Sequence, residues 1–319
     1  MSLVKFKLLL FNVFLVLGNH EVDVLDTPLE FLQSANVARQ EAIREACKSY
    51  TSQYNMEYIP RSYFNNIIVD HKHRFLYCYI PKVACTNWKR VLMILTDKWN
   101  ETDPVTIPAD LPHRPRMFTR LSHYSQYSRE YMLQRYEKMV LVRNPFERVL
   151  SAYRSKLVGN SGTAREFQNR VGRRIVRYFR ENPTNYSLRH GNDVTFTEFT
   201  KFLTERPEEL TSIVNNEHWR PMTELCHPCL VNYTLVGKYE TIMEDARLTL
   251  HKINASHIAF PRRIRPSPTR GLLPYYFSQL DRTLIRRLRD VYSKDFEIFN
   301  YTIDNIGPLD IGNEMSSFN

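Results

Sequence analysis

Three stretches of the chain share one pattern: a short apolar run, a polar turn, and then apolar residues at helical spacing. The apolar runs cover residues 75–80, 139–142 and 233–236, and the helical patterns that follow them cover residues 87–95, 146–157 and 240–253. Short apolar runs bounded by turn residues predict buried strands, and the helical spacing predicts amphipathic helices. Strands that alternate with helices predict an α/β fold with a central parallel sheet flanked by helices. Two further helices are predicted, over residues 29–54 and 274–299.

The N-terminus has a pattern of its own, with Lys5 and Lys7 ahead of an apolar run at residues 8–17. This order is typical of a cleavable signal peptide or a short type II signal-anchor, here residues 1–18. The run is shorter than the roughly 17–25 residues of an ordinary span, so both interpretations stay open, as does a buried N-terminal helix. The basic flank predicts a cytosolic N-terminus, a single membrane anchor and a lumenal remainder. We expect a stem at residues 19–62, a folded domain at 63–305 and a tail at 306–319.

Five Asn-x-Ser/Thr sequons support a lumenal location, at Asn100, Asn185, Asn232, Asn254 and Asn300. Each sequon alone is a weak signal, but five together with a signal-like N-terminus carry more weight. A lumenal chain does not meet chromosomal DNA, so we expect no nucleic-acid partner.

Composition narrows the class of partner. The chain has 44 Lys and Arg against 34 Asp and Glu, a net charge of +10, which indicates an anionic partner. Only 9 of the 319 residues are Gly, which argues against Gly-rich dinucleotide loops. Mean hydropathy is −0.44 and there is one long apolar run, so a multi-pass membrane protein is excluded.

Two of the predicted strand-to-helix turns carry phosphate-binding chemistry. In open α/β sheets, ligands bind beyond the carboxyl ends of the strands, where helix N-termini favour anions. The turn at residues 81–87 offers the charge of Lys82 and the hydroxyl of Thr86, although an ordinary turn fits it equally well. The turn at residues 143–151 offers Arg143 and Ser151, an arrangement suited to a second phosphate. No Walker A loop and no metal site are visible, so the two turns indicate a doubly phosphorylated nucleotide.

These two turns resemble the 5′-phosphosulfate and 3′-phosphate loops of lumenal sulfotransferases. The resemblance extends to the carbohydrate sulfotransferase family of HNK-1 sulfotransferase and the chondroitin and dermatan 4-O-sulfotransferases. It covers roughly residues 65–302 and includes the stretches at residues 192–199, 216–219, 225–229, 235–240 and 292–301. It implies a P-loop-like sulfotransferase fold, with residues 63–305 as the catalytic domain. It also implies 3′-phosphoadenosine 5′-phosphosulfate (PAPS) as the sulfate donor, with no metal.

The resemblance assigns donor-binding residues by position. The first loop supplies Pro81, Lys82, Val83, Ala84, Cys85, Thr86 and Asn87. The second supplies Arg143, Asn144, Pro145, Phe146, Glu147, Arg148, Val149, Leu150 and Ser151. Lys82 is implied to stabilise charge on the bridging oxygen as the S–O bond breaks. Ala84 and Cys85 stand where many sulfotransferases have Gly-Thr, a variant typical of the 4-O-sulfotransferase group.

A general base is needed to take the proton of the acceptor hydroxyl. His218 is our candidate, with Glu217 as the alternative and His123 as a third possibility without a motif. Trp219 is expected to stack on a sugar ring. A structural His-Trp pair in a loop is an equally good interpretation of residues 218 and 219.

The expected acceptor is the 4-hydroxyl of N-acetylgalactosamine in a chondroitin-like, acidic glycosaminoglycan. Dermatan, terminal N-acetylgalactosamine of a glycoprotein and glucuronic acid are alternatives, and a catalytically silent glycan-binding protein is the alternative of another class. The arginines expected to form a track for the glycan are Arg165, Arg170, Arg173, Arg174, Arg177, Arg180 and Arg189. A second basic segment contains Arg262, Arg263, Arg265 and Arg270. The family implies a Golgi membrane location.

The five cysteines include the pair Cys226 and Cys229, for which a zinc site is improbable because no second Cys pair accompanies it. In an oxidising lumen these cysteines are expected to form a structural disulfide, either with each other or with another cysteine. Cys85 is the expected free thiol.

Overall fold

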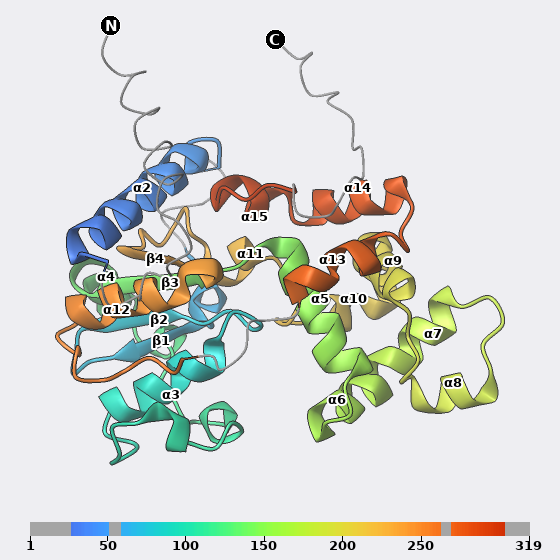
Figure 1. The fold of residues 1–319 in the computed structure, drawn as a ribbon, viewed down its shortest axis with the longest axis horizontal. Coiled ribbons are helices and arrows are strands. Elements are labelled where there is room, and N and C mark those ends of the chain that lie inside the picture. The colour runs from blue at the N-terminus through green and yellow to red at the C-terminus, as the bar shows by residue number, and fades with distance from the viewer. Residues whose placement is uncertain (1–26, 51–58, 263–268, 304–319) are drawn as a thin grey trace, which may run out of the picture.

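A four-stranded sheet organises the protein in the computed structural model, which describes residues 27–50, 59–262 and 269–303. The strands are β1 (Ile67–Asp70), β2 (Phe75–Cys78), β3 (Glu137–Val142) and β4 (Leu235–Lys238), in the spatial order β1-β2-β3-β4 (Figure 1). β2, β3 and β4 are parallel, with Tyr77 opposite Met139 and Val140 opposite Val236. β1 pairs antiparallel with β2 and is the strand that the sequence pattern did not predict. The predicted α/β fold is confirmed, with an antiparallel edge added to the parallel sheet.

One half of the molecule is built around this sheet (Figure 1). Its helices are α2 (Leu29–Cys47), α3 (Cys85–Leu95), α4 (Gln126–Arg135) and α12 (Ile242–Lys252). The range expected to form a stem contains α2, which packs against β4. There the Asn36 side chain donates to the Thr234 carbonyl at 2.9 Å and accepts from the Val236 N–H at 2.8 Å. The helix ends at Cys47, so the expected helix over residues 29–54 is too long.

The other half is helical and has a separate hydrophobic core (Figure 1). It contains α5 (Pro145–Tyr153), α6 (Gly162–Phe167), α7 (Arg173–Phe179), α8 (Asn185–His190), α9 (Phe196–Glu205), α10 (Thr211–Val214), α13 (Thr269–Phe277) and α14 (Arg282–Val291). Two π-helical segments, Arg154–Val158 and Gln168–Gly172, interrupt the run between α5 and α7. The short helices α11 (Met222–Cys226) and α15 (Ser293–Ile298) lie where the halves meet.

The single helix expected over residues 274–299 is wrong, because three helices cover this range. The Asp281 carboxylate accepts from the Leu284 N–H at 2.7 Å and so starts α14 after the turn that follows α13. Tyr292 then separates α14 from α15. Each of the three helices buries apolar residues, so the apolar spacing in the sequence resembled that of one helix.

Two disulfides cross-link the sheet half. Cys47 at the end of α2 bonds to Cys229, and Cys78 at the end of β2 bonds to Cys226. The two cysteines of the 226–229 segment therefore pair with distant partners and not with each other. Cys85 is a buried free thiol, as predicted.

The N-terminal segment at residues 1–18 and the tail at residues 306–319 lie outside the described residues. Within the described ranges, no helix is both long and apolar enough to span a membrane.

Candidate functional site

The loop after β2 has the backbone of an anion-binding turn. Lys82 and Ala84 both adopt positive φ angles, 73° and 49°, and no side chain caps the N-terminus of α3 that follows. A turn of this kind directs successive backbone N–H groups toward one point, and the uncapped helix end adds its dipole. The Lys82 ammonium lies in the same place and donates a hydrogen bond to the Ser155 hydroxyl at 2.7 Å. Burial, followed by the charge of Lys156, lowers the pKa of Lys82 to about 8.

The loop after β3 brings Arg143 to the same edge of the sheet. Its guanidinium is 1% exposed and donates to the Glu147 carboxylate at 3.1 and 3.3 Å and to the Lys82 carbonyl at 3.3 Å. It also lies 4.2 Å from the ring centroid of Tyr239, which follows β4. The carboxyl ends of all three parallel strands therefore contribute to one site, as the strand order requires.

A cavity of about 420 Å³ lies between these loops. Its lining includes eight residues that the sequence had assigned to the donor loops: Pro81, Lys82, Ala84, Cys85, Thr86, Asn87, Arg143 and Ser151. His218 lines it as well, so the structure brings the two predicted loops and the predicted base together. None of the described residues that line it is Asp or Glu, so this lining has the electrostatics of an anion site.

Sequence reasoning missed several lining residues, namely His113, Ser155, Lys156, Ser161, Thr163 and Tyr239. Ser155 and Lys156 belong to the π-helical segment that follows α5, and Ser155 is one turn beyond the predicted Ser151. His113 comes from the loop after α3 and forms a 2.9 Å hydrogen bond with Thr86. The helical spacing from Ser151 was the one available signal for Ser155.

The other residues assigned to the second loop have structural contacts. Phe146, Val149 and Leu150 lie in the helical core, and the Asn144 side chain caps α5 by accepting from the Phe146 and Glu147 N–H groups. Val83 of the first loop is likewise fully buried. These side chains hold the loops in shape and do not line the cavity.

Arg148 connects the first loop to the loop of His218. Its guanidinium is buried and donates to three carbonyls: Pro81 at 3.1 Å, Glu217 at 2.8 Å and Arg220 at 2.6 Å. From the sequence, Arg148 was predicted to bind the sulfate donor. The structure shows it holding the two loops side by side.

His218 has the tautomer of a proton acceptor. Its Nδ1 lies 2.8 Å from the Asn216 side-chain oxygen, which also accepts from the His218 backbone N–H at 3.1 Å. Because an amide oxygen only accepts, Nδ1 carries the hydrogen and Nε2 keeps its lone pair. Burial, followed by the charges of Lys156 and Lys82, lowers the pKa of His218 to about 2. A bound anion would offset those charges and raise this pKa.

The other residues considered for acceptor chemistry lie elsewhere. The Glu217 carboxylate accepts from the Tyr79 hydroxyl at 3.2 Å, and neither Glu217 nor His123 lines the cavity. Trp219 is 1% exposed, and its indole N–H donates to the Ile213 carbonyl at 3.0 Å. The expectation that Trp219 stacks on a sugar ring is therefore wrong, and its role is structural.

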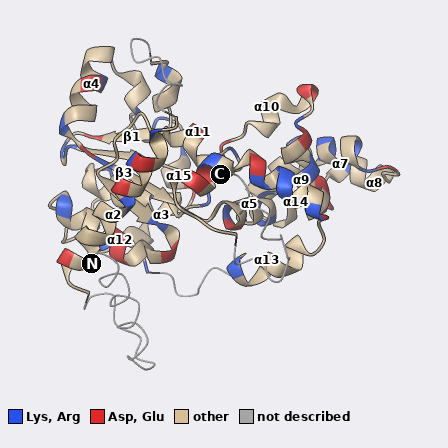
Figure 2. Cartoon of the chain, turned by 90° about the horizontal axis from the view of Figure 1, so that it is seen from above, with Lys and Arg blue, Asp and Glu red and all other residues tan. Residues whose placement is uncertain are grey.

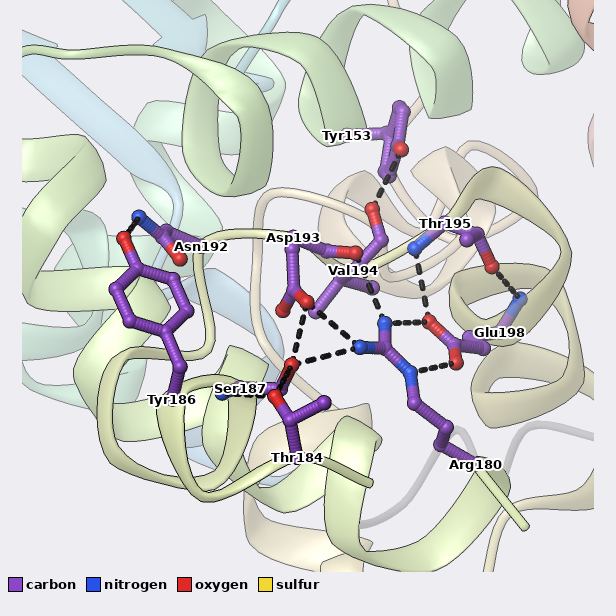
Figure 3. A network of polar contacts seen from close by, with 10 residues as sticks. All are labelled: Tyr153, Arg180, Thr184, Tyr186, Ser187, Asn192, Asp193, Val194, Thr195 and Glu198. Atoms are coloured by element: carbon purple, nitrogen blue, oxygen red, sulfur yellow. Dashed lines mark hydrogen bonds and ion pairs between the residues drawn. The ribbon is translucent and has the colours of Figure 1, made fainter. Parts of the chain in front are cut away.

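One arginine of the predicted glycan track is part of a structural network. The Arg180 guanidinium forms a two-pronged pair with Glu198 at 2.7 and 2.9 Å and contacts Asp193 at 2.6 Å (Figure 3). These hydrogen bonds raise the pKa of Arg180. The remaining six arginines of the track are exposed on α6, α7, α8 and the π-helical segment between α6 and α7. Figure 2 shows the basic residues of α7 at one end of the molecule.

Of the second basic segment, Arg263 and Arg265 lie outside the described residues, and Arg262 and Arg270 are exposed. Within the described ranges, no group of three or more His, Cys, Asp or Glu side chains is arranged to hold a metal ion.

Comparison with known proteins identifies the family. The sulfotransferase family model matches residues 65–302, and the chain belongs to this family. Carbohydrate sulfotransferase 11 of Rattus norvegicus is 36% identical over 280 residues, which are 85% of this chain and 77% of the relative. Carbohydrate sulfotransferase 14 of Homo sapiens is 39% identical over 77% of this chain and 62% of the relative. Carbohydrate sulfotransferase 8 of Homo sapiens is 33% identical over 85% of this chain and 63% of the relative. No solved structure matches the chain.

Proposed function

We propose that this protein transfers the sulfuryl group of PAPS to the 4-hydroxyl of N-acetylgalactosamine in a chondroitin-like glycosaminoglycan. One observation carries the proposal: a single cavity is lined by Lys82, Arg143, Ser151 and His218, and no Asp or Glu is found among its lining residues in the described part of the chain. Membership of the sulfotransferase family and similarity to carbohydrate sulfotransferases support the reaction class.

The cavity suits a donor with several negative charges. Lys82 and Lys156 present ammonium groups, and Arg143 presents a planar fork suited to a phosphate. The positive φ angles at Lys82 and Ala84 and the uncapped start of α3 add backbone N–H donors at the same place. We assign the 5′ end of the donor to this loop and the 3′-phosphate to Arg143 and Ser151.

His218 is the proposed general base. Its Nε2 lone pair is free to accept the proton of the sugar hydroxyl, because Asn216 holds the hydrogen on Nδ1. The hydroxyl oxygen attacks sulfur, and the bond from sulfur to the phosphate oxygen breaks with its electron pair on that oxygen. Lys82 stabilises the developing charge there.

The acceptor assignment rests on two features. Ala84 and Cys85 in the first loop follow the variant typical of the 4-O-sulfotransferase group. α6 lines the cavity through Thr163, and the exposed arginines of α6, α7 and α8 supply positive charge in the helical half that begins there. Dermatan, terminal N-acetylgalactosamine and glucuronic acid are the acceptors that a direct assay must exclude.

We further propose that the protein is a type II Golgi membrane protein with a lumenal catalytic domain, anchored by residues 1–18. Two disulfides support an oxidising compartment. The asparagines of all five sequons are exposed, so glycans at these positions fit the fold.

The test incubates the purified full-length chain with labelled PAPS and a panel of desulfated glycosaminoglycans and glycoprotein glycans, followed by disaccharide analysis. We expect 4-sulfated N-acetylgalactosamine from chondroitin. If the labelled sulfate is found at another hydroxyl or on another acceptor, that hydroxyl or acceptor replaces the one proposed here. If the protein binds PAPS but transfers sulfate to no acceptor, the proposed sulfotransferase activity is refuted and a glycan-binding protein is favoured.

A further inference from the structure

Lys156 is a cation of the cavity that the proposed function has not yet used. It belongs to the π-helical segment Arg154–Val158 directly after α5. Single π turns inside helical runs occur frequently at functional sites. Here the segment places two consecutive residues, Ser155 and Lys156, in the lining of the cavity.

The surroundings of Lys156 place it next to the proposed base. Its ammonium lies 4.6 Å from the ring centroid of Phe167, and the His218 ring meets the same phenyl ring edge to face at 5.1 Å. Phe167 is 6% exposed and packs in the helical core, so it is a fixed support for both side chains.

Ser155, which precedes Lys156 in the chain, contacts Lys82, the lysine proposed to act in catalysis. Ser155 accepts the hydrogen bond from Lys82 at 2.7 Å. The π-helical segment is therefore joined to Lys82 through Ser155 and lies beside His218 through Phe167. Lys82, Lys156 and His218 border one cavity from three separate segments of the chain.

Lys156 forms no direct ion pair within the described ranges. Burial lowers its pKa, although the charge of Glu166, which itself pairs with Arg170 at 3.7 Å, acts on it from farther away and raises that pKa. Among the described residues Lys156 has no Asp or Glu partner within 4.0 Å, and no acidic side chain lines the cavity. After burial, its charge is the largest cause lowering the pKa of both Lys82 and His218. Two ammonium groups that face one cavity without a carboxylate repel each other, and an anion between them removes that repulsion.

We propose that Lys156 is a second catalytic cation, whose ammonium contacts the non-bridging oxygens of the sulfuryl group during transfer. This inference rests on the proposed function. As the acceptor oxygen bonds to sulfur and the bond to the phosphate oxygen breaks, the hydroxyl proton goes to Nε2 of His218. Lys156 keeps its proton and stabilises the oxygens of the transferring group, while Lys82 stabilises the leaving oxygen.

The test compares Lys156→Met with Lys156→Arg and measures two sets of quantities. The first is kcat and KM for both substrates. The second is the Kd of 3′-phosphoadenosine 5′-phosphate, which has the phosphates of the donor and lacks the sulfuryl group. We expect Lys156→Met to lower kcat by about 100-fold while this Kd changes by no more than a few-fold. Lys156→Arg, which keeps the charge, should recover much of the loss. Lys252→Met removes an exposed lysine at the end of α12 and is the control for lost positive charge.

Three results would overturn the role of Lys156. A raised acceptor KM with unchanged kcat would assign the residue to acceptor binding. A Kd weakened as much as kcat falls would assign it to the donor phosphates, and unchanged kinetics would leave it no role. If Lys156→Met does not fold, as judged by circular dichroism, Lys156→Gln provides the same comparison. Failure of the wild-type chain to transfer sulfate refutes the proposed function instead, so the two failures are distinguishable.

Discussion

The cavity lined by Lys82 and Lys156 and the network around Arg180 both gather charged side chains, but they balance charge in opposite ways. In the network, Arg180 is surrounded by the carboxylates of Glu198 and Asp193, and the Ser187 hydroxyl donates to Asp193 at 2.6 Å (Figure 3). In the cavity, Lys82 and Lys156 both belong to the lining, and none of the described lining residues is Asp or Glu. Arg143 of the cavity is itself paired with Glu147, so the contrast is between Arg180 and the two lysines. The ion pairs of Arg180 stabilise the fold, whereas a cation that forms no ion pair is available to an anion.

This difference separates two groups of basic residues that look alike in the sequence. Arg180 stands within a run of arginines, yet its partners come from α8, α9 and the loop between them. Lys82 stands alone, yet the fold brings Lys156 and Arg143 to it. Substitutions in the cavity should therefore change activity with little change in stability, and substitutions in the network should do the reverse.

The largest expected effect is that of Lys82→Ala. Removing one charged group that stabilises the transition state should lower kcat by about 10²- to 10³-fold. The midpoint of thermal unfolding should stay near that of the wild type. The measurement is sulfate transfer from labelled PAPS, with unfolding followed by circular dichroism. Full activity in the variant would show that Lys82 is not part of the reaction.

Arg180→Met tests the opposite side of the comparison. It removes the guanidinium from the Glu198 and Asp193 carboxylates, which keep the Thr195 N–H and the Ser187 hydroxyl as donors, and should lower the free energy of unfolding by about 2 kcal/mol. Below its unfolding transition, the variant should keep its kcat because the network does not line the cavity. Denaturant unfolding measures the loss, and Arg177→Met, an exposed arginine three residues earlier, is the matched control. Equal stability of the two variants would contradict a structural role for Arg180.

The features that could be predicted from the sequence are those with local causes. A strand, a turn and a helix follow one another in the chain, so the three parallel strands and both donor loops were visible as patterns. β1 was missed because an edge strand of residues 67–70 pairs antiparallel with its neighbour and has no following helix. The pairing of Cys47 with Cys229 joins residues 182 positions apart, which spacing alone cannot reveal.

The missing parts of the site have non-local causes. Lys156 enters the cavity because the helix changes to π geometry after Tyr153, and His113 enters because its loop folds back onto Thr86. Trp219 was expected at a sugar because it directly follows the candidate base His218 in the sequence, but adjacent residues on a tight turn point in different directions. Only the folded chain shows that one of the pair faces the cavity and the other the core.

Asn216→Ala sharpens the assignment of His218 within the cavity. Without the Asn216 oxygen, nothing at that position holds the hydrogen on Nδ1, so part of the imidazole adopts the tautomer that cannot accept a proton at Nε2. We expect kcat to fall by roughly 10-fold, less than the 10²- to 10⁴-fold of a lost general base. Steady-state kinetics with Asn216→Ala and His218→Gln compare the two losses. A fall in Asn216→Ala as large as that in His218→Gln would show that Asn216 does more than orient the ring.

The smallest effect concerns the pH dependence of donor binding, which follows from the uncompensated charge on Lys82. Its pKa in the free protein is about 8, so the ammonium is mostly charged below this pH and loses its proton above it. A bound anion raises this pKa, so binding and proton uptake are coupled above about pH 8. Between about pH 8 and 9, the affinity for 3′-phosphoadenosine 5′-phosphate should fall by about 5-fold, as the charged fraction of Lys82 does. Below that range, Lys82 should add little pH dependence.

Calorimetric titrations across this pH range measure the effect. Lys82→Arg is the matched variant, because a guanidinium stays charged throughout the range. Its binding curve should therefore lose the decline above pH 8. If the affinity of Lys82→Arg falls above pH 8 in the same way, another group titrates. That result would contradict the prediction that the charge of Lys82 contributes to anion binding.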